Sequence, residues 1–249
     1  FGGLRTGMGA LADAVLAAVL AAGGELRTGL PVRELRRTPE GFRLVAGPVP
    51  APTALDCDGV VVAVPAPKAA PLLRGVAPSA AGELAGIDYA SMAIVTLVYP
   101  EGDLPPGSGV LVPTSERRTV KALTFASQKW AHLAGHGHVV RASIGRYGEE
   151  HTLQHDDTEL VAAAVSDIAA LTGLASAPVA SRVTRWGGAL PQYAVGHLDR
   201  VRRIRASVAG VAGLAVCGAA YDGVGIPACI RSGQTAARTV LAGLEESKP

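Results

Sequence analysis

Apolar residues recur along this chain with two periods, one typical of helices and one typical of strands. Between Gly9 and Ala22 they return every three or four positions, at Leu11, Val15 and Ala18, which predicts a helix. The run Val60-Val-Val-Ala-Val64 is apolar without a break. A continuous β-branched run of this length predicts a strand that is covered on both faces.

The other elements up to residue 88 are short and divided by Gly and Pro. We expect strands over 25–28, 32–37 and 42–45, a loop with three prolines over 46–55, and a helix over 69–87.

From Tyr89 onward the pattern changes to longer strands with turns between them. Strand candidates cover 92–99, 109–112, 119–125 and 138–144, and they predict an antiparallel sheet. Asp156 and Asp157 precede a helix with an apolar stripe. A strand over 179–186, a helix over 197–208, a strand over 214–217 and a last helix beginning at Pro227 follow.

This order predicts a mixed α/β fold, with α+β character, in which one Rossmann-like domain is interrupted by a second. We expect residues 1–88 and 209–249 to form parts of the first domain. Residues 89–208 then form an inserted domain of antiparallel sheet and helix.

Composition narrows the function classes. The 249 residues carry 23 basic and 21 acidic side chains, and the basic ones are scattered, so we do not expect a nucleic-acid partner. No uninterrupted 18-residue apolar run is present, so we predict no transmembrane segment. Three cysteines without metal spacing suit a reducing compartment, and we expect a cytoplasmic location and no metal site.

The most informative run joins a strand to a helix near the C-terminus. After Leu214-Ala-Val-Cys217 the chain places Gly218, Gly223 and Gly225 within eight residues, and a helix follows at Pro227. Glycine permits close approach and unusual backbone angles, and proline is well placed at the start of a helix. The backbone N–H groups at such a helix start can face an electron-rich ligand.

A second unusual run is Arg185-Trp-Gly-Gly-Ala-Leu-Pro-Gln-Tyr-Ala-Val-Gly-His197. It brings Trp186, Gln192, Tyr193 and His197 to the end of a strand, where ligands often bind. A buried tryptophan beside a turn is an equally good interpretation.

Two other patterns are less specific. Gly7-Met-Gly-Ala-Leu-Ala12 matches G-x-G-x-x-A, but a dinucleotide site needs a hydrophobic strand directly upstream, and tight helix packing is the alternative. The histidines near 132–138 and 151–155 do not have a spacing that favours a metal. Because no pair of side chains has acid–base spacing, we predict no catalytic residue, and the chemistry would belong to a cofactor.

Three runs together resemble a known family. They are Phe1-Gly-Gly-Leu-x-x-Gly-Met-Gly-x-Leu11, Ala189-Leu-Pro-Gln-Tyr-Ala-Val-Gly-His197 and Gly218-x-x-Tyr-x-Gly-Val-Gly-Ile-Pro-x-Cys229. In this order they resemble the C-terminal half of the oxygen-dependent protoporphyrinogen oxidases, above all the bacterial branch that oxidises coproporphyrinogen III. The resemblance covers nearly all 249 residues, and its third motif is the most specific.

The resemblance implies an FAD-binding domain of the amine-oxidase-like superfamily with an inserted substrate domain. It implies removal of six electrons from a porphyrinogen, with O2 as acceptor and H2O2 as product, in heme biosynthesis. The expected partners are the porphyrinogen substrate, O2 and downstream enzymes of the heme pathway. Whether the substrate is coproporphyrinogen III or protoporphyrinogen IX stays open.

The resemblance also implies roles for single positions. The backbone of Val32 would contact the adenine, and Trp186 would lie near the flavin. The glycine loop and helix start would lie against the isoalloxazine or ribityl, a set made up of Gly218, Gly223, Val224, Gly225, Ile226 and Pro227. Thr124 and Ser143 would line the substrate pocket.

The sequence departs from the family in two respects. It lacks the arginine that such enzymes use for a substrate propionate. It also lacks the N-terminal βαβ unit that holds the pyrophosphate, so we expect a fragment that binds FAD poorly or not at all. Two other functions stay open: another flavin amine oxidase or desaturase, and a non-catalytic remnant that binds porphyrin or a protein partner.

Overall fold

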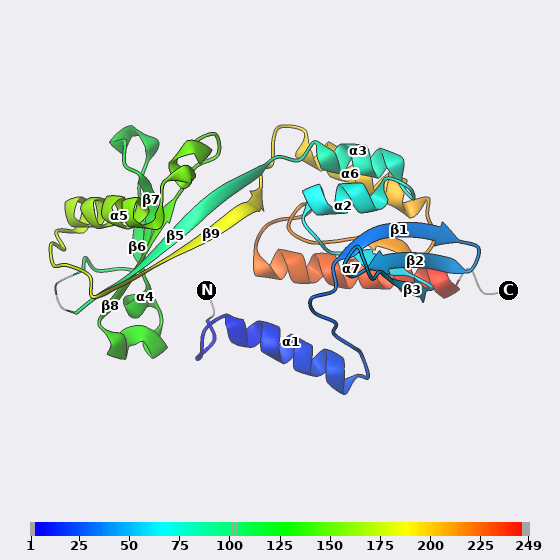
Figure 1. The fold of residues 1–249 in the computed structure, drawn as a ribbon, viewed down its shortest axis with the longest axis horizontal. Helices are drawn as coiled ribbons and strands as arrows, with labels where there is room; N and C mark the ends of the chain where they lie inside the picture. The colour runs from blue at the N-terminus through cyan, green and yellow to red at the C-terminus, as the bar shows by residue number, and fades with distance from the viewer. Residues whose placement is uncertain (1–2, 101, 103, 246–249) are drawn as a thin grey trace. The chain divides into compact units, whose positions relative to one another are not determined.

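A computed structural model describes residues 3–100, 102 and 104–245, except for the side chain of His136. Phe1 and Gly2 of the first family-like motif therefore lie outside the described residues. The chain divides into two compact units (Figure 1). Unit 1 comprises residues 1–26 and 90–189, and unit 2 comprises residues 27–89 and 190–249.

Unit 1 is built on a five-stranded antiparallel sheet in the order β6-β7-β8-β5-β9 (Figure 1). Its strands are β5 (Tyr89–Tyr99), β6 (Gly109–Leu111), β7 (Val120–Phe125), β8 (His138–Ile144) and β9 (Ala180–Pro191). Helix α5 (Asp157–Thr172) covers one face of the sheet. Alternate strand residues such as Val95, Leu123 and Ala142 are buried against Leu160 and Ile168 of this helix.

The ends of α5 follow from local chemistry. The Asp156 carboxylate accepts a hydrogen bond from the Glu159 N–H at 2.9 Å, and the Glu159 side chain accepts one from the Asp156 N–H, which completes a capping box. Gly173 ends the helix in the left-handed conformation at φ 79°.

Shorter elements complete unit 1. They are α1 (Gly9–Ala21), η1 (Thr114–Glu116), α4 (Ala126–Lys129), η2 (Ala131–His136) and η3 (Glu150–Gln154). Helix α1 is rich in Ala, Val and Leu, yet it buries none of its residues.

Unit 2 contains two small sheets. Strands β1 (Val32–Thr38), β2 (Gly41–Ala46) and β3 (Thr53–Cys57) form an antiparallel meander. Strands β4 (Val60–Val62) and β10 (Leu214–Val216) pair in parallel, with Leu214 opposite Val60.

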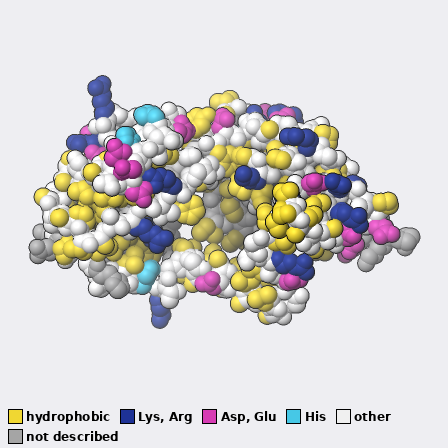
Figure 2. Space-filling view, in the orientation of Figure 1, with side chains coloured by type: hydrophobic (Ala, Val, Ile, Leu, Met, Phe, Trp, Pro, Cys, Tyr) yellow, Lys and Arg dark blue, Asp and Glu magenta, His cyan; other side chains and the backbone are white. Residues whose placement is uncertain are grey.

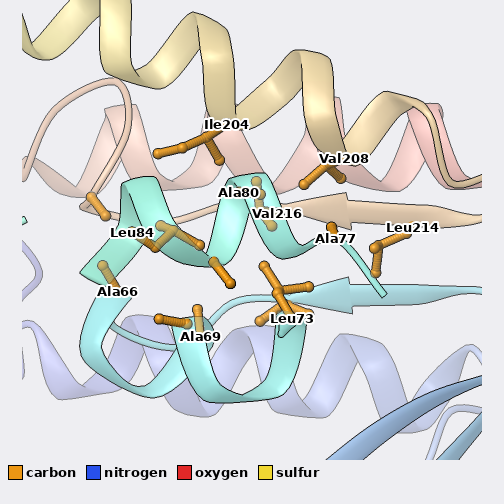
Figure 3. Close-up of a cluster of buried hydrophobic side chains, with 14 of the residues drawn as sticks. Ala66, Ala69, Leu73, Ala77, Ala80, Leu84, Ile204, Val208, Leu214 and Val216 are labelled. Carbon is orange, nitrogen blue, oxygen red and sulfur yellow. The ribbon is translucent and has the colours of Figure 1, made fainter. Parts of the chain in front are cut away.

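Helices lie on both faces of the parallel pair. Leu214 and Val216 point into a core formed by α2 (Ala66–Leu73), α3 (Pro78–Ala85) and α6 (His197–Ala209), as Figure 3 shows. Ala215 and Cys217 pack instead against Ala236 and Val240 of α7 (Ile226–Glu245). This alternation buries both faces of β10, and Cys217 lies among apolar residues. The strand predicted to be covered on both faces was β4, where Val62 is buried but Val61 is 38% exposed, so the prediction is wrong for one face of that strand.

Most predicted elements are present, and three differ. The expected helix over 69–87 is two helices, because the backbone breaks at residues 74–77, ahead of Pro78. Residues 25–28 form no strand. Part of the expected loop over 46–55 belongs to β3, which pairs with β2 from Thr53 to Cys57. The predicted mixed α/β class is confirmed.

The division into units differs from the predicted domains at 1–88, 89–208 and 209–249. The change near residue 89 coincides with the division between Tyr89 and Ala90. Helix α6, however, packs through Val201, Ile204 and Val208 in the core of unit 2. Residues 1–26 group with unit 1.

Candidate functional site

The glycine-rich loop connects β10 to α7 within unit 2. Gly218 and Gly223 adopt φ angles of 118° and 137°, which other residues rarely adopt. The Gly218 N–H donates to the Ser232 hydroxyl at 3.2 Å, so the first turn of the loop is tied to the body of α7. The predicted strand–loop–helix arrangement is confirmed, with the helix beginning one residue before Pro227.

The start of α7 offers an apolar surface beside backbone donors. Val224 and Ile226 are 51% and 46% exposed. The first N–H groups of a helix have no partner within the helix, and they carry a partial positive charge. Apolar side chains beside the N–H groups of a helix start are a combination that suits an electron-rich planar ring.

Tyr193 supports the same loop from the segment ahead of α6. Its hydroxyl donates to the Ala219 carbonyl, and its ring stacks on His197 at 4.1 Å between centroids. His197 is 8% exposed. The sequence singled out both residues by type, but their stacking depends on the turn at Gly196, which has a left-handed φ of 85°.

Tyr221 lies inside the loop and was not predicted as a functional residue. It is 1% exposed, and its hydroxyl has no hydrogen-bond partner among the described residues. Burial raises the pKa of Tyr193, Tyr221 and Cys217, so these groups keep their protons at neutral pH. They can donate hydrogen bonds there but do not supply a base.

Val32 begins β1 in unit 2, opposite Ala46, just before an irregularity in the pairing. Trp186 is the remaining residue that was predicted to contact the cofactor, and it lies in unit 1 on β9. Its side chain is 53% exposed, so the interpretation as a buried tryptophan is wrong.

Thr124 and Ser143 share one face of the unit 1 sheet. Thr124 pairs with Arg141, while Ser143 pairs with Ala122, the second residue before Thr124. Their neighbours Leu123 and Ala142 point to the α5 side, so alternation sends Thr124 and Ser143 to the opposite face. Both side chains are half-buried.

Arg141 adds a positive charge to this face. Its guanidinium lies 5.7 Å from the ring centroid of Trp130, and it makes no ion pair with a described residue. Trp186 also points away from α5, because Arg185 beside it donates to the His155 carbonyl at the start of that helix. The sheet face opposite α5 thus combines hydroxyl, aromatic and cationic groups, and the position of Arg141 was not predicted.

The structure also bears on the two less specific sequence patterns, the Gly7–Ala12 run and the histidines near 132–138 and 151–155. Residues 3–8, ahead of α1, form turns and no strand, so the Gly7–Ala12 run lacks the setting of a dinucleotide fingerprint. Among the described residues no group of three or more His, Cys, Asp or Glu side chains could hold a metal ion.

Surface charge and helix hydropathy concern two predictions, that the chain has no nucleic-acid partner and no transmembrane segment. On the face that Figure 2 shows, described Lys and Arg side chains are interspersed with Asp and Glu. Within the described part of the chain no helix is long and apolar enough to cross a membrane.

Residues 1–241 match the family of flavin-containing amine oxidoreductases. The chain therefore belongs to this family, and the cofactor prediction of FAD is confirmed at that level.

Within this class the chain is similar to porphyrinogen oxidases. It is 43% identical over 174 residues to the coproporphyrinogen III oxidase of Mycobacterium leprae, which covers 70% of this chain and 38% of that protein. It is 34% identical over 241 residues to the coproporphyrinogen III oxidase of Propionibacterium freudenreichii, covering 96% and 44%. The chain thus spans about two-fifths of the length of these relatives.

A solved structure shows the same similarity to porphyrinogen oxidases. The crystal structure of the "Putative protoporphyrinogen oxidase" from Exiguobacterium sp. 255-15 superposes with a TM-score of 0.83 at 32% identity. It covers 97% of this chain and 52% of that one. The predicted family resemblance is confirmed, while the roles of the individual site residues stay predictions.

Proposed function

We propose that this chain supplies the flavin-ring surface and the substrate surface of an oxygen-dependent porphyrinogen oxidase in heme biosynthesis. The observation that carries the proposal is the 43% identity to a coproporphyrinogen III oxidase in a chain whose glycine loop and helix start suit a flavin. Coproporphyrinogen III is the proposed substrate.

The proposed cofactor residues act through shape and backbone. Val224 and Ile226 would contact the flavin ring, and the start of α7 would stabilise negative charge on it. Helix-terminal interactions of this kind contribute about 0.3–2 kcal/mol. When bound, FAD supplies the hydride acceptor for each of three two-electron oxidations, and O2 takes the electrons as H2O2.

The proposed substrate surface is the sheet face opposite α5. Thr124 and Ser143 would orient the macrocycle, and the Arg141 guanidinium would bind one of its carboxylates. Tyr193, Tyr221 and Cys217 would not act as bases, because burial raises the pKa of each and they hold their protons at neutral pH.

The test uses the 249-residue chain in two preparations. One is the chain alone, and the other is the chain co-expressed with the part of the M. leprae relative that the match leaves uncovered. Each is assayed with FAD and coproporphyrinogen III for porphyrin fluorescence and for H2O2. We expect weak flavin absorbance and no turnover for the chain alone, and both signals in the complemented pair.

Protoporphyrinogen IX is the matched comparison substrate. A faster rate with this dicarboxylate than with the tetracarboxylate would overturn the choice of substrate. A well-folded complemented pair that binds porphyrin but turns over neither compound would favour the non-catalytic remnant.

A further inference from the structure

A pocket of about 300 Å³ lies in unit 1, where the segment around η1 meets the segment that enters η3. Its lining consists of three arginines, three threonines and one glutamate: Arg117, Arg118, Arg146, Thr114, Thr119, Thr152 and Glu149. None of these residues has a part in the proposed flavin or porphyrinogen surfaces. Three fixed positive charges therefore face one lining carboxylate.

Arg146 holds its charge inside the protein. Its side chain is 16% exposed, and its guanidinium donates to the carbonyls of Arg118 at 3.1 Å, Val112 at 3.3 Å and Val120 at 3.5 Å. These carbonyls are neutral, and the Glu149 carboxylate is 3.6 Å away, beyond a close hydrogen bond. The Arg146 charge is therefore fixed in place by three carbonyls and faces one carboxylate, and an anion in the pocket would gain from it.

Arg118 is also incompletely neutralised. The distance from its guanidinium to Asp167 is 3.4 Å, while the other oxygen of Asp167 accepts from the Val120 N–H at 2.9 Å. Lys121 also senses this positive charge. Its pKa is lowered by burial and by the charge of Arg146.

Arg117 stands out by its backbone. At φ 49° it is the only non-glycine residue with a positive φ among the described residues. Such a conformation costs energy and is found often at ligand-binding positions. The Arg117 guanidinium makes no hydrogen bond or ion pair with any described residue, and the hydroxyls of Thr114 and Thr119 likewise have no described partner.

We propose that this pocket binds a small oxyanion, a carboxylate or a phosphate, held by the Arg117 and Arg118 guanidinium groups and the Thr114 and Thr119 hydroxyls beside the fixed charge of Arg146. Arginine pairs with both ligand groups through two parallel hydrogen bonds. Threonine hydroxyls supply the remaining donors.

The experiment is an NMR titration of the 249-residue chain with sodium phosphate and, separately, with sodium propionate, at constant ionic strength. We expect saturable shifts confined to the amides of residues 112–121 and 145–152. Tighter binding of phosphate would assign the pocket to phosphate groups, and tighter binding of propionate to carboxylates; either supports the site.

Variants separate a site from general ionic attraction. Arg117→Gly removes the guanidinium and suits the positive φ, so the fold is kept while affinity falls about tenfold. Arg117→Lys keeps the charge without the planar fork and recovers part of the affinity. Arg182→Ala removes another exposed arginine, outside the pocket, and should change affinity less than about twofold.

Two outcomes would overturn the proposal. One is the absence of saturable shifts with both anions in a chain whose spectrum shows it to be folded. The other is an equal loss of affinity in Arg117→Gly and Arg182→Ala.

Discussion

The rings of Tyr193 and His197 stack almost in parallel, 4.1 Å apart at an angle of 13°. Only three residues separate them, and the turn at Gly196 between them brings one over the other. Because the Tyr193 hydroxyl also bonds to Ala219, this pair connects the start of α6 to the glycine-rich loop. The geometry of the candidate flavin surface therefore depends on a segment that lies outside it.

Tyr193→Phe should show what this connection contributes. The variant keeps the stacked ring and loses the hydrogen bond to Ala219, so we expect the free energy of unfolding to fall by about 1 kcal/mol. Tyr193→Leu also removes the stacking and should lose about 0.5–1.5 kcal/mol more. Urea unfolding measures both, and an unchanged midpoint for Tyr193→Phe would show that the loop does not need the bond.

Two glycines of the loop should respond differently to alanine. Gly223 has a φ of 137°, and an added Cβ would lie 3.1 Å from the Cβ of Ala228. Gly223→Ala should therefore cost about 1–2 kcal/mol in unfolding free energy. Gly225 is the matched control, because its added Cβ would meet nothing closer than Pro227 at 3.9 Å. Equal losses in urea titrations of the two variants would contradict this account.

Tyr221 should make the fold sensitive to alkali. Burial raises its pKa above the value of about 10 that tyrosine has in an unfolded chain. The unfolded chain therefore loses this proton first. The stability contributed by Tyr221 is complete below pH 10 or so and is lost as pH rises towards the folded pKa.

Tyr221→Phe is the variant that tests this. It removes a buried hydroxyl without a described partner, so at pH 7 we expect stability to be unchanged or higher by up to about 1 kcal/mol. Its loss of stability above about pH 10 should be smaller than in the parent chain, though not absent, because the pKa values of Tyr89 and Tyr99 are raised as well. Tyr147→Phe, at a more exposed position, should keep the full alkaline loss.

Arg141→Met should weaken binding of coproporphyrin III, measured by porphyrin fluorescence. The prediction rests on the proposed substrate surface, where Arg141 would pair with a carboxylate. Loss of a charge-assisted hydrogen bond at a half-exposed position corresponds to about a tenfold lower affinity. Protoporphyrin IX, with fewer carboxylates, should be affected less, and Arg238→Ala, at an exposed position of α7 outside this face, should affect neither porphyrin. Equal losses for both porphyrins would argue for a role of Arg141 in shape alone.

The elements that were predicted well are those whose sequence pattern reports burial directly. Leu214–Val216 and the glycines after it could be recognised because an uninterrupted apolar strand and a positive φ both restrict residue choice. Strand β3 could not, because Thr53-Ala-Leu-Asp-Cys57 has little apolar alternation and is held by pairing with β2. The face shared by Thr124, Ser143 and Arg141 depends on strand register, which pattern alone does not determine.

Helix α7 connects two places that are far apart. At one end Ser232 holds Gly218; further along, Val240 packs so closely on Gly59 that a Cβ there would lie 2.5 Å from it. Ile226 and Val240 are separated by about 21 Å of straight helix. A side chain added at Gly59, in the turn between β3 and β4, would push against Val240 and tilt α7. We expect this tilt to displace Val224 and Ile226 at the start of the helix, although the added side chain would not touch them.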